Sequence, residues 1–305
     1  MKVLVTGVNG QLGHDVVNEL SKRGHTCVGS DITAEYAGIP DTSAVTTAAY
    51  AGMDITNAEQ VNEVLNAVKP DAVIHCAAWT NVDGAEDPAV ASKVRAINGS
   101  GTQNIATICK VLDCKMMYIS TDYVFDGWGT EPWQPDCKDY RPLNFYGQTK
   151  LEGELAVAGT LEKYFIVRIA WVFGLNGKNF VKTMLNVAKT HDTVRVVNDQ
   201  IGTPTYTIDL ARLLVDMIET EKYGYYHATN EGGYISWYDF TKEIYRQARL
   251  NIKIVPVTTA EYGVSVAARP FNSRLDKSKL VQNGFRPLPD WRDALARYLN
   301  EIGES

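Results

Sequence analysis

The sequence is poor in the features that mark secreted, membrane-embedded or nucleic-acid-binding chains. Its five cysteines form no Cys-x-x-Cys pair, which disfavours a disulfide framework and a zinc site and suits a reducing compartment. No apolar stretch reaches the ~18 residues of a membrane span. The amino terminus enters a strand pattern directly, without the segments of a signal peptide. We therefore expect a cytoplasmic protein with buried thiols and no membrane partner.

The composition also lacks a surplus of positive charge. The 30 Lys and Arg residues face 36 Asp and Glu residues, which gives a net charge of −6. Binding along a duplex needs clustered lysine and arginine, so we expect no nucleic acid partner. The five histidines are scattered without a pair at ligand spacing, and we predict no metal site. A small anionic substrate stays compatible with this charge, because a few local donors can outweigh it.

Strand and helix patterns alternate along the first two-thirds of the chain, as in a parallel sheet covered by helices on both faces. The expected strands are residues 2–6, 26–30, 72–76, 115–120 and 164–170. The expected helices are residues 11–23, 57–68, 86–112 and 146–157. This order predicts an α/β fold with a right-handed, doubly wound parallel Rossmann sheet. Ligands of such sheets bind beyond the carboxyl ends of the strands, where we find Gly7, Asp31, Ala77, Thr121 and Trp171.

The length of 305 residues suggests about two domains at ~150 residues each. We expect residues 1–170 to form the dinucleotide-binding domain, with part of residues 195–222 returning to it. Residues 171–305 would then form mainly a smaller, discontinuous substrate domain. Residues 33–50 show little periodicity and are expected to be a loop or a partly mobile insertion. Helices are also expected from Ser236, as N-cap, to Arg249 and from Trp291 to Ile302.

The first expected strand leads straight into three glycines and then a helical pattern. Strand, turn and helix form the context that a dinucleotide fingerprint requires. Gly7 would permit the tight turn, Gly10 would let the backbone approach a pyrophosphate, and Gly13 would let the helix pack closely on its strand. A glycine-rich turn without a ligand is the alternative. The turn predicts a nicotinamide cofactor site formed by Gly7, Asn9, Gly10, Gln11, Leu12 and Gly13.

An acidic residue ends the second expected strand. Asp31 lies close to the distance of ~20 residues beyond the glycines at which a carboxylate accepts from the adenosine ribose. A carboxylate there repels a 2′-phosphate and favours NADH over NADPH, whereas an ordinary turn cap is the alternative. Asp54 and Ile55 are candidates for the adenine side of the site, and Thr56 is a candidate cap of the next helix.

A potential proton-donating group lies in the middle of the chain. Tyr146 and Lys150 are four residues apart and would share one face of a helix. A tyrosine hydroxyl titrates near pH ~10, and an adjacent ammonium would lower that pKa toward working pH. Thr121, at a strand end, could hydrogen-bond the same substrate oxygen. A chance spacing is the alternative, and the glycine turn argues against it.

Several longer motifs resemble those of the dTDP-4-dehydrorhamnose reductase family, a branch of the extended short-chain dehydrogenases. The resemblance runs essentially from end to end. Its specific elements are Ser120-Thr121-Asp122-Tyr123-Val124-Phe125, Gln200-Ile201-Gly202-Thr203-Pro204-Thr205 and Arg269-Pro270-Phe271-Asn272-Ser273-Arg274-Leu275. Two departures are a longer segment between Asp31 and Asp54 and a Cys76 where the family usually has alanine.

The resemblance implies hydride transfer from NADPH or NADH to the C4 ketone of dTDP-4-dehydro-L-rhamnose, giving dTDP-L-rhamnose. It implies that Tyr146 donates a proton, that Lys150 holds the nicotinamide ribose, and that Ala77, Ala78 and Trp79 line the cofactor site. It also implies sugar contacts for Asp122 and Trp171, although Trp171 could equally be core. Arg269 and Arg274 could bind the substrate diphosphate through their guanidinium groups, or could form surface ion pairs.

Three features stay open at this level. Some relatives are described as Mg²⁺-dependent dimers, but no full set of carboxylate ligands can be matched, so a monomer and a homodimer are both compatible with the sequence. An NAD-dependent sugar-nucleotide epimerase or dehydratase shares the fold and the Tyr-Lys pair. A non-catalytic relative, such as the regulatory beta subunit of methionine adenosyltransferase, would bind a partner instead, but here Thr121, Tyr146 and Lys150 are all present.

Overall fold

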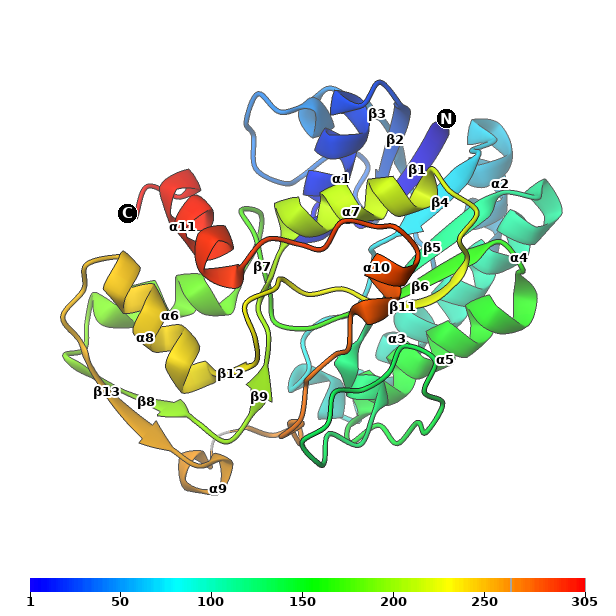
Figure 1. The fold of residues 1–305 in the computed structure, drawn as a ribbon. Helices are drawn as coiled ribbons and strands as arrows, with labels where there is room; N and C mark the ends of the chain where they lie inside the picture. Colours follow the sequence, from blue (N-terminus) through cyan, green and yellow to red (C-terminus); the bar gives the residue numbers. More distant parts are fainter. Residues whose placement is uncertain (264, 305) are drawn as a thin grey trace.

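Seven short apolar segments pair side by side into one parallel sheet. The computed structural model describes residues 1–263 and 265–304 and shows this sheet beside a smaller lobe (Figure 1). Every neighbouring pair in the sheet is parallel, so the expected doubly wound fold is confirmed. In spatial order, the strands are β11 (Gly224–His227), β6 (Tyr164–Ile169), β5 (Lys115–Thr121), β4 (Ala72–His75), β1 (Lys2–Thr6), β2 (Thr26–Asp31) and β3 (Ala49–Gly52).

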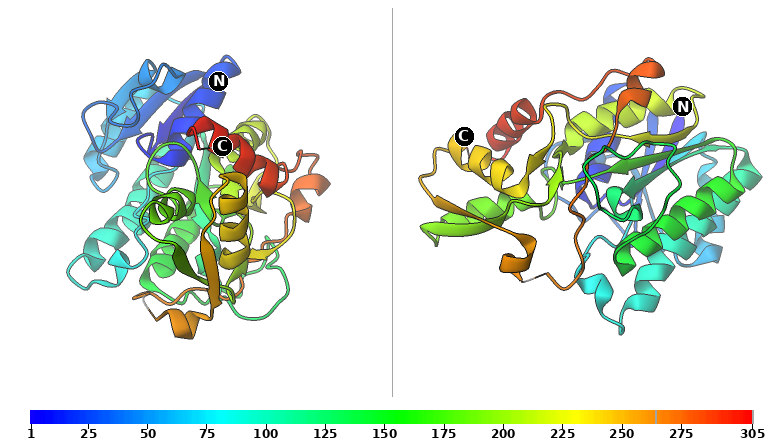
Figure 2. Two further views of the ribbon diagram at one scale, coloured as in Figure 1. Left: turned by 90° about the vertical axis from the view of Figure 1, so that its left-hand side faces the viewer. Right: turned by 60° about the horizontal axis from the view of Figure 1, so that its bottom comes forward.

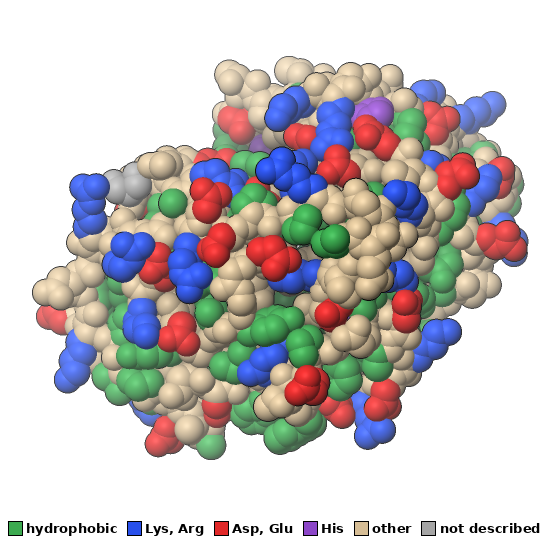
Figure 3. Space-filling view, viewed as in Figure 1, with side chains coloured by type: hydrophobic (Ala, Val, Ile, Leu, Met, Phe, Trp, Pro, Cys, Tyr) green, Lys and Arg blue, Asp and Glu red, His purple; other side chains and the backbone are tan. Residues whose placement is uncertain are grey.

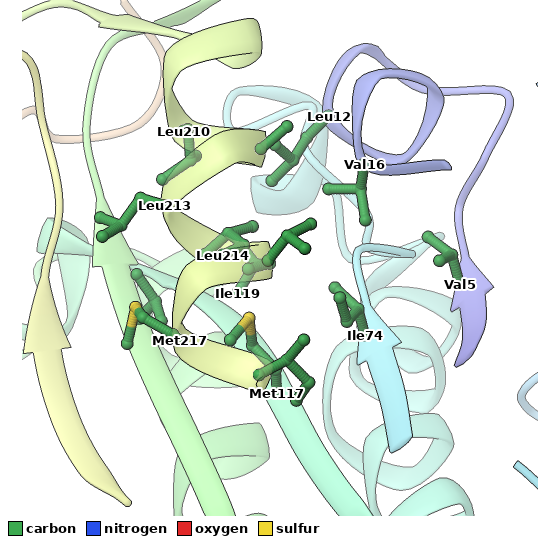
Figure 4. Packing of buried hydrophobic residues seen from close by; sticks show 14 of the residues in the cluster. Val5, Leu12, Val16, Ile74, Met117, Ile119, Leu210, Leu213, Leu214 and Met217 are labelled. Atoms are coloured by element: carbon green, nitrogen blue, oxygen red, sulfur yellow. The ribbon is translucent and has the colours of Figure 1, made fainter. Parts of the chain in front are cut away.

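The alternation of side chains along each strand places one apolar set on each face of the sheet. On β1, Val3 and Val5 pack with helices α1 (Gln11–Lys22) and α7 (Thr207–Ile218), whereas Leu4 packs on the opposite face. Leucines of α7 meet Leu12 and Val16 of α1 and the strands beneath them (Figure 4). The opposite face is covered by α2 (Ala58–Val68), α4 (Thr102–Leu112) and α5 (Phe145–Thr160). Each leucine or valine side chain that is buried in these layers contributes roughly 1.5–3 kcal/mol to the free energy of unfolding.

The order of the strands reverses beside β1, which lies between β2 and β4. Chain connections leave β1 and β4 in opposite directions across the sheet, so a crevice opens at the carboxyl ends of these two strands. Open α/β sheets bind their ligands at such a switch point. The fold therefore places the ends of β1, β4 and β5 around one crevice.

The smaller lobe lies beyond the carboxyl ends of the strands (Figure 2). A parallel pair of strands, β8 (Thr193–Val197) and β13 (Lys253–Val257), packs with α6 (Phe180–Ala188) and α8 (Trp237–Gln247). The closing helix α11 (Trp291–Glu301) covers the same core, which contains Phe240 and Trp291. The helices near residues 236–249 and 291–302 are confirmed, and Ser236 caps α8 in a reciprocal capping box with Asp239.

Short elements connect the two parts of the molecule. Two-residue strands pair as β7 (Val172–Phe173) with β10 (Thr205–Tyr206) and as β9 (Ile201–Gly202) with β12 (Ile235–Ser236). The remaining turns and short helices are η1 (Ala44–Thr46), η2 (Gly84–Glu86), α3 (Ala91–Arg95), η3 (Ala96–Gly101), η4 (Asp122–Val124), α9 (Thr259–Tyr262) and α10 (Ser278–Gln282).

The chain crosses to the smaller lobe after β6 and later returns to the sheet. Within residues 195–222, helix α7 packs against α1, whereas β8 at the start of that range belongs to the smaller lobe. Strand β11 then pairs with β6 at the edge of the large sheet. The Rossmann layer is consequently built from the first 170 residues together with α7 and β11.

One local prediction holds only in part, and two were wrong. Residues 33–50 are not simply a loop, because they contain η1 and the start of the edge strand β3, and Val45 is buried in the core. The single helix expected over residues 86–112 is divided into η2, α3, a π-helical turn η3 and α4. Helix α2 is capped by Asn57, whose Oδ1 accepts from the Glu59 and Gln60 amides, and not by Thr56.

The burial of the cysteines, the apolarity of the helices and the surface charge are consistent with the composition. All five cysteines are free thiols, of which Cys27, Cys109 and Cys114 are buried and the other two are partly buried. Across residues 1–263 and 265–304, no helix combines the length and apolarity needed to cross a bilayer. Acidic and basic side chains are interspersed on the face shown in Figure 3, without a continuous basic stripe.

Candidate active site

One cleft of about 680 Å³ opens at the carboxyl ends of the central strands, within the usual size range of small-molecule sites. Most of the residues predicted for the site line it, whereas Asn9, Trp79, Arg269 and Arg274 do not. The predicted residues that line the cleft are Gly7, Gly10, Gln11, Leu12, Gly13, Asp31, Asp54, Ile55, Ala77, Ala78, Thr121, Asp122, Tyr146, Lys150 and Trp171.

The glycine turn at one end of the cleft excludes side chains by close backbone contacts. Gly7 has φ +74°, and a Cβ there would lie 2.6 Å from the Ala77 amide nitrogen. A Cβ on Gly13 would lie 2.3 Å from the Gly7 carbonyl oxygen, so α1 packs directly on the turn. Gly10 caps α1 without a side-chain hydrogen bond, which leaves the first helix amides available to an anion. This geometry fits a dinucleotide cofactor.

Asp31 lies in the cleft beside the glycine turn. Its Oδ2 accepts from the Asn9 amide at 3.0 Å and its Oδ1 accepts from the Ile32 amide at 2.8 Å. Asn9 does not line the cleft, because its side chain donates to Thr33 Oγ1 and accepts from the Ala37 amide. Asn9 therefore ties the segment after β2 to the glycine turn and thereby helps to hold Asp31.

Trp79 is also directed away from the cleft. Its indole nitrogen donates to the Asn81 carbonyl oxygen at 2.9 Å, and its amide donates to Asn98 Oδ1 at 2.9 Å. Asn98, within the π-helical turn η3, donates in turn to Thr149 on α5 at 3.0 Å. Trp79 thus shapes the wall after β4, and Ala77 and Ala78 are the residues of that segment that reach the cleft.

Helix α5 brings the catalytic candidates together. Asn144 caps it by accepting from the Gly147 amide at 2.8 Å. A Cβ on Gly147 would lie 2.3 Å from the Tyr123 carbonyl oxygen, so the first turn of α5 touches the turn that follows β5. As a result, Tyr146 lies within hydrogen-bonding reach of Thr121 at the end of β5.

Burial controls the acidity of the Tyr146–Lys150 pair. Burial raises the pKa of Tyr146 above its ordinary value, the Asp122 carboxylate adds to the rise, and the hydrogen bond with Thr121 opposes it. Burial lowers the pKa of Lys150 to about 7, against the opposing charge of Glu154. The predicted lowering of the Tyr146 pKa is therefore wrong, because desolvation of the phenol raises this pKa and is its largest cause. The Lys150 ammonium donates to the Ile119 carbonyl oxygen at 2.8 Å.

A buried ion pair fixes α5 against the sheet. Arg168 of β6 donates through Nε and Nη2 to the two Glu154 carboxylate oxygens at 2.8 and 2.7 Å, and both side chains are fully buried. Ser120 donates to the same carboxylate at 2.5 Å. Removing one partner of such a pair lowers the free energy of unfolding by about 3–5 kcal/mol, because the other charge stays buried without a partner. The pair therefore holds Lys150, one helical turn before Glu154, beside the end of β5.

The opposite end of the cleft carries Asp122 and Trp171. Burial raises the pKa of Asp122 to about 6, against the effect of the Ser273 and Thr121 hydroxyl groups. Trp171 has φ +51° and stacks on Trp237, with ring centroids 3.6 Å apart and an interplanar angle of 15°. It both lines the cleft and packs against the core of the smaller lobe, so its core role is confirmed and the sugar contact stays a prediction.

The two arginines predicted for the diphosphate do not line the cleft, and both have hydrogen-bond partners within the chain. Arg269 donates to Asp83 Oδ2 at 2.6 Å and to the Tyr123 hydroxyl at 3.2 Å. Arg274 donates to Asn272 Oδ1 at 3.0 Å. The ion pair between Arg269 and Asp83 agrees with the alternative prediction, in which this arginine forms an ion pair within the protein.

The cleft includes residues that the sequence reasoning missed. The loop between β7 and α6 contributes Asn176, Gly177 and Lys178, and the segment after β4 contributes Thr80 and Val82. No periodic pattern places these residues at the cleft, because they reach it through long-range contacts. The signal that could have found the loop is the Gly-Lys-Asn sequence shortly after the expected end of a strand.

Fold and cleft together define an oxidoreductase of the extended short-chain dehydrogenase type. The model of the family described as RmlD substrate binding domain matches residues 1–304. The chain belongs to this family, the family of the dTDP-4-dehydrorhamnose reductases.

Curated relatives and a solved structure resemble the chain over nearly its whole length. The spore coat polysaccharide biosynthesis protein SpsK of Bacillus subtilis (strain 168) is 37% identical over 98% of this chain and 97% of the relative. The dTDP-4-dehydrorhamnose reductase of Aggregatibacter actinomycetemcomitans is 36% identical over 96% and 97%. A crystal structure of dTDP-4-dehydrorhamnose reductase from Bacillus anthracis str. Ames, in complex with NADP, is 38% identical, with a TM-score of 0.88 over 98% of this chain and 99% of that one.

Proposed function

We propose that this chain reduces the C4 ketone of dTDP-4-dehydro-L-rhamnose to dTDP-L-rhamnose with NADPH or NADH. The observation that carries the proposal is the cleft, which has the glycine turn at one end and Thr121, Tyr146 and Lys150 converging beside the strand ends. Family membership supplies the substrate class. The nicotinamide cofactor supplies the hydride.

Tyr146 acts as the proton donor in this proposal. Because burial raises its pKa, the phenol stays protonated at neutral pH and has a proton to give when negative charge builds on the ketone oxygen. Thr121 contributes a hydrogen bond to the same oxygen, at the position where the charge develops. Lys150 is fixed by the Ile119 carbonyl and holds the nicotinamide ribose.

The sugar would lie against Asp122 and Trp171, which line the end of the cleft near the smaller lobe. The indole of Trp171 offers an apolar face to the 6-deoxy carbon, and Asp122 offers an acceptor to a sugar hydroxyl. Arg269 and Arg274 do not line the cleft, so we assign them no contact with the substrate. No metal ion is part of the proposed chemistry.

The test is oxidation of NADPH or NADH by the purified protein with dTDP-4-dehydro-L-rhamnose, followed by the loss of near-ultraviolet absorbance. Tyr146→Phe should lower kcat by roughly 10²–10⁴-fold, the usual contribution of a general acid, while its affinity for the coenzyme stays unchanged. Tyr262→Phe is the matched control, because this tyrosine lies on α9, outside the cleft.

Two outcomes would reject the assignment. Turnover without net oxidation of added coenzyme would indicate an epimerase or dehydratase, which regenerates its cofactor in each cycle. Coenzyme binding without any turnover of the nucleotide sugar would favour a non-catalytic relative. Full activity of Tyr146→Phe would instead show that another group donates the proton.

A further inference from the structure

Among the described residues that line the cleft, the cationic side chains are Lys150 and Lys178. The Lys150 ammonium is buried and donates to the Ile119 carbonyl oxygen. Lys178 is exposed, and its ammonium forms no hydrogen bond or ion pair with the described part of the chain. One positive charge in the cleft is thus not used by the fold.

The loop that carries Lys178 lies against the glycine turn. Asn176 Nδ2 donates to the Asn9 carbonyl oxygen at 2.9 Å, and Asn179 Nδ2 donates to Gln11 Oε1 at 3.0 Å. A Cβ on Gly177 would lie 3.5 Å from Cγ of Gln11. Lys178 therefore lies between one residue that is bonded to the glycine turn and one that is bonded to the first residue of α1.

A second lysine keeps this loop in place. Lys182, on the first turn of α6, donates through Nζ to the Leu175 carbonyl oxygen at 2.5 Å and to the Gly177 carbonyl oxygen at 3.0 Å. Both flanks of Lys178 are thus anchored by hydrogen bonds. Such anchoring lowers the conformational entropy that the loop would lose when it contacts a ligand.

A bound dinucleotide would place its diphosphate at this end of the cleft, beside the glycine turn. The coenzyme diphosphate carries two negative charges, and the α1 amides stabilise it only through partial charges. The carboxylates that line the neighbouring wall, Asp31 and Asp54, cannot neutralise it. An ammonium beside the turn supplies the missing full positive charge.

We propose that Lys178 binds the diphosphate of the nicotinamide coenzyme and is a cofactor-binding residue of this chain. The inference rests on the proposed function, in that a nicotinamide dinucleotide is the ligand of the glycine turn. The substrate also contains a diphosphate, but the contacts of the loop to Asn9 and Gln11 direct Lys178 to the coenzyme side.

Equilibrium binding of NADP⁺, NAD⁺ and ADP-ribose without substrate tests this assignment. Lys178→Ala should lower the affinity for all three ligands by about tenfold, which is the effect of losing one charge-assisted hydrogen bond. Lys178→Arg should retain most of the affinity, because it keeps the charge. Lys110→Ala is the matched control, since this exposed lysine lies on α4 outside the cleft. The affinity lost in Lys178→Ala should shrink at high ionic strength.

Three results would overturn the inference. Unchanged affinity of Lys178→Ala would show that the ammonium has no ligand there. A loss confined to NADP⁺ would place Lys178 at the 2′-phosphate. A raised KM for the nucleotide sugar, with unchanged coenzyme binding, would place it at the substrate diphosphate. Because binding is measured without turnover, a wild-type protein that binds coenzyme but reduces no sugar would reject the proposed function and leave this inference standing.

Discussion

Asp31 is the single residue that we predict to set coenzyme preference. The Asn9 and Ile32 amides hold its carboxylate at the cleft, where it would accept from the ribose 2′-hydroxyl and repel a 2′-phosphate. We predict that Asp31→Ala raises the kcat/KM ratio of NADPH to NADH by about tenfold, equivalent to about 1.4 kcal/mol. Steady-state rates with both coenzymes measure the ratio.

The substitution also removes two hydrogen-bond acceptors, so a second variant separates charge from structure. Asp31→Asn keeps one acceptor oxygen and loses the charge, and it should change the ratio in the same direction. If neither variant alters the ratio, the carboxylate serves only to hold the Asn9 and Ile32 amides, and coenzyme choice is made elsewhere.

At the level of residues, the sequence predicts the groups whose role depends on local geometry. Gly7 and Gly13 could be predicted because the strand, turn and helix around them are contiguous. Lys178 could not, since its position depends on hydrogen bonds from its neighbours to residues about 170 positions earlier. The guanidinium chemistry of Arg269 predicts an anionic partner, but it does not reveal the ion pair with Asp83, which is far away in the sequence.

The contact between α1 and the glycine turn makes a prediction at the scale of one element. A Cβ on Gly13 would lie 2.3 Å from the Gly7 carbonyl oxygen, so Gly13→Ala should push the helix from the turn. We expect a loss of about 1–3 kcal/mol in the free energy of unfolding, typical of overpacking, together with weaker coenzyme binding. Denaturant unfolding and coenzyme titration measure the two effects.

Helix α5 offers a matched control for that substitution. Gly159 is helical and exposed near the end of α5, and a Cβ added there would meet no heavy atom within 4 Å. Gly159→Ala should therefore stabilise the protein by about 0.5 kcal/mol, because alanine favours the helix, and should leave coenzyme binding unchanged. Equal effects of the two substitutions would contradict the close-contact explanation.

Elements with strong periodicity could be predicted, and elements shaped by tertiary contacts could not. The edge strand β3 has the sequence Ala-Tyr-Ala-Gly, with one strong strand former, and it forms because β2 offers a partner edge. The π-helical turn η3 interrupts an otherwise helical pattern at a point where Asn98 bonds to the Trp79 backbone and to Thr149. Neither interaction leaves a periodic signal.

The whole molecule depends on the late segments that complete the sheet. Residues 1–170 lack α7, which covers α1, and β11, which pairs with β6. We predict that a fragment of residues 1–170 does not form a stable domain and binds a hydrophobic dye, because an apolar helix face and a strand edge stay uncovered. Near-ultraviolet circular dichroism and dye fluorescence, with the full chain as control, check this. A fragment with native-like spectra that binds coenzyme would contradict the prediction.

The same arrangement has a consequence for biosynthesis. As the nascent chain leaves the ribosome, the glycine turn and Tyr146 emerge well before β11 does, yet the sheet that supports them gains its last strand only at residue 227. The amino-terminal half therefore cannot complete its sheet until tens of further residues have been translated. In the cell, chaperones would meet this protein chiefly during that interval.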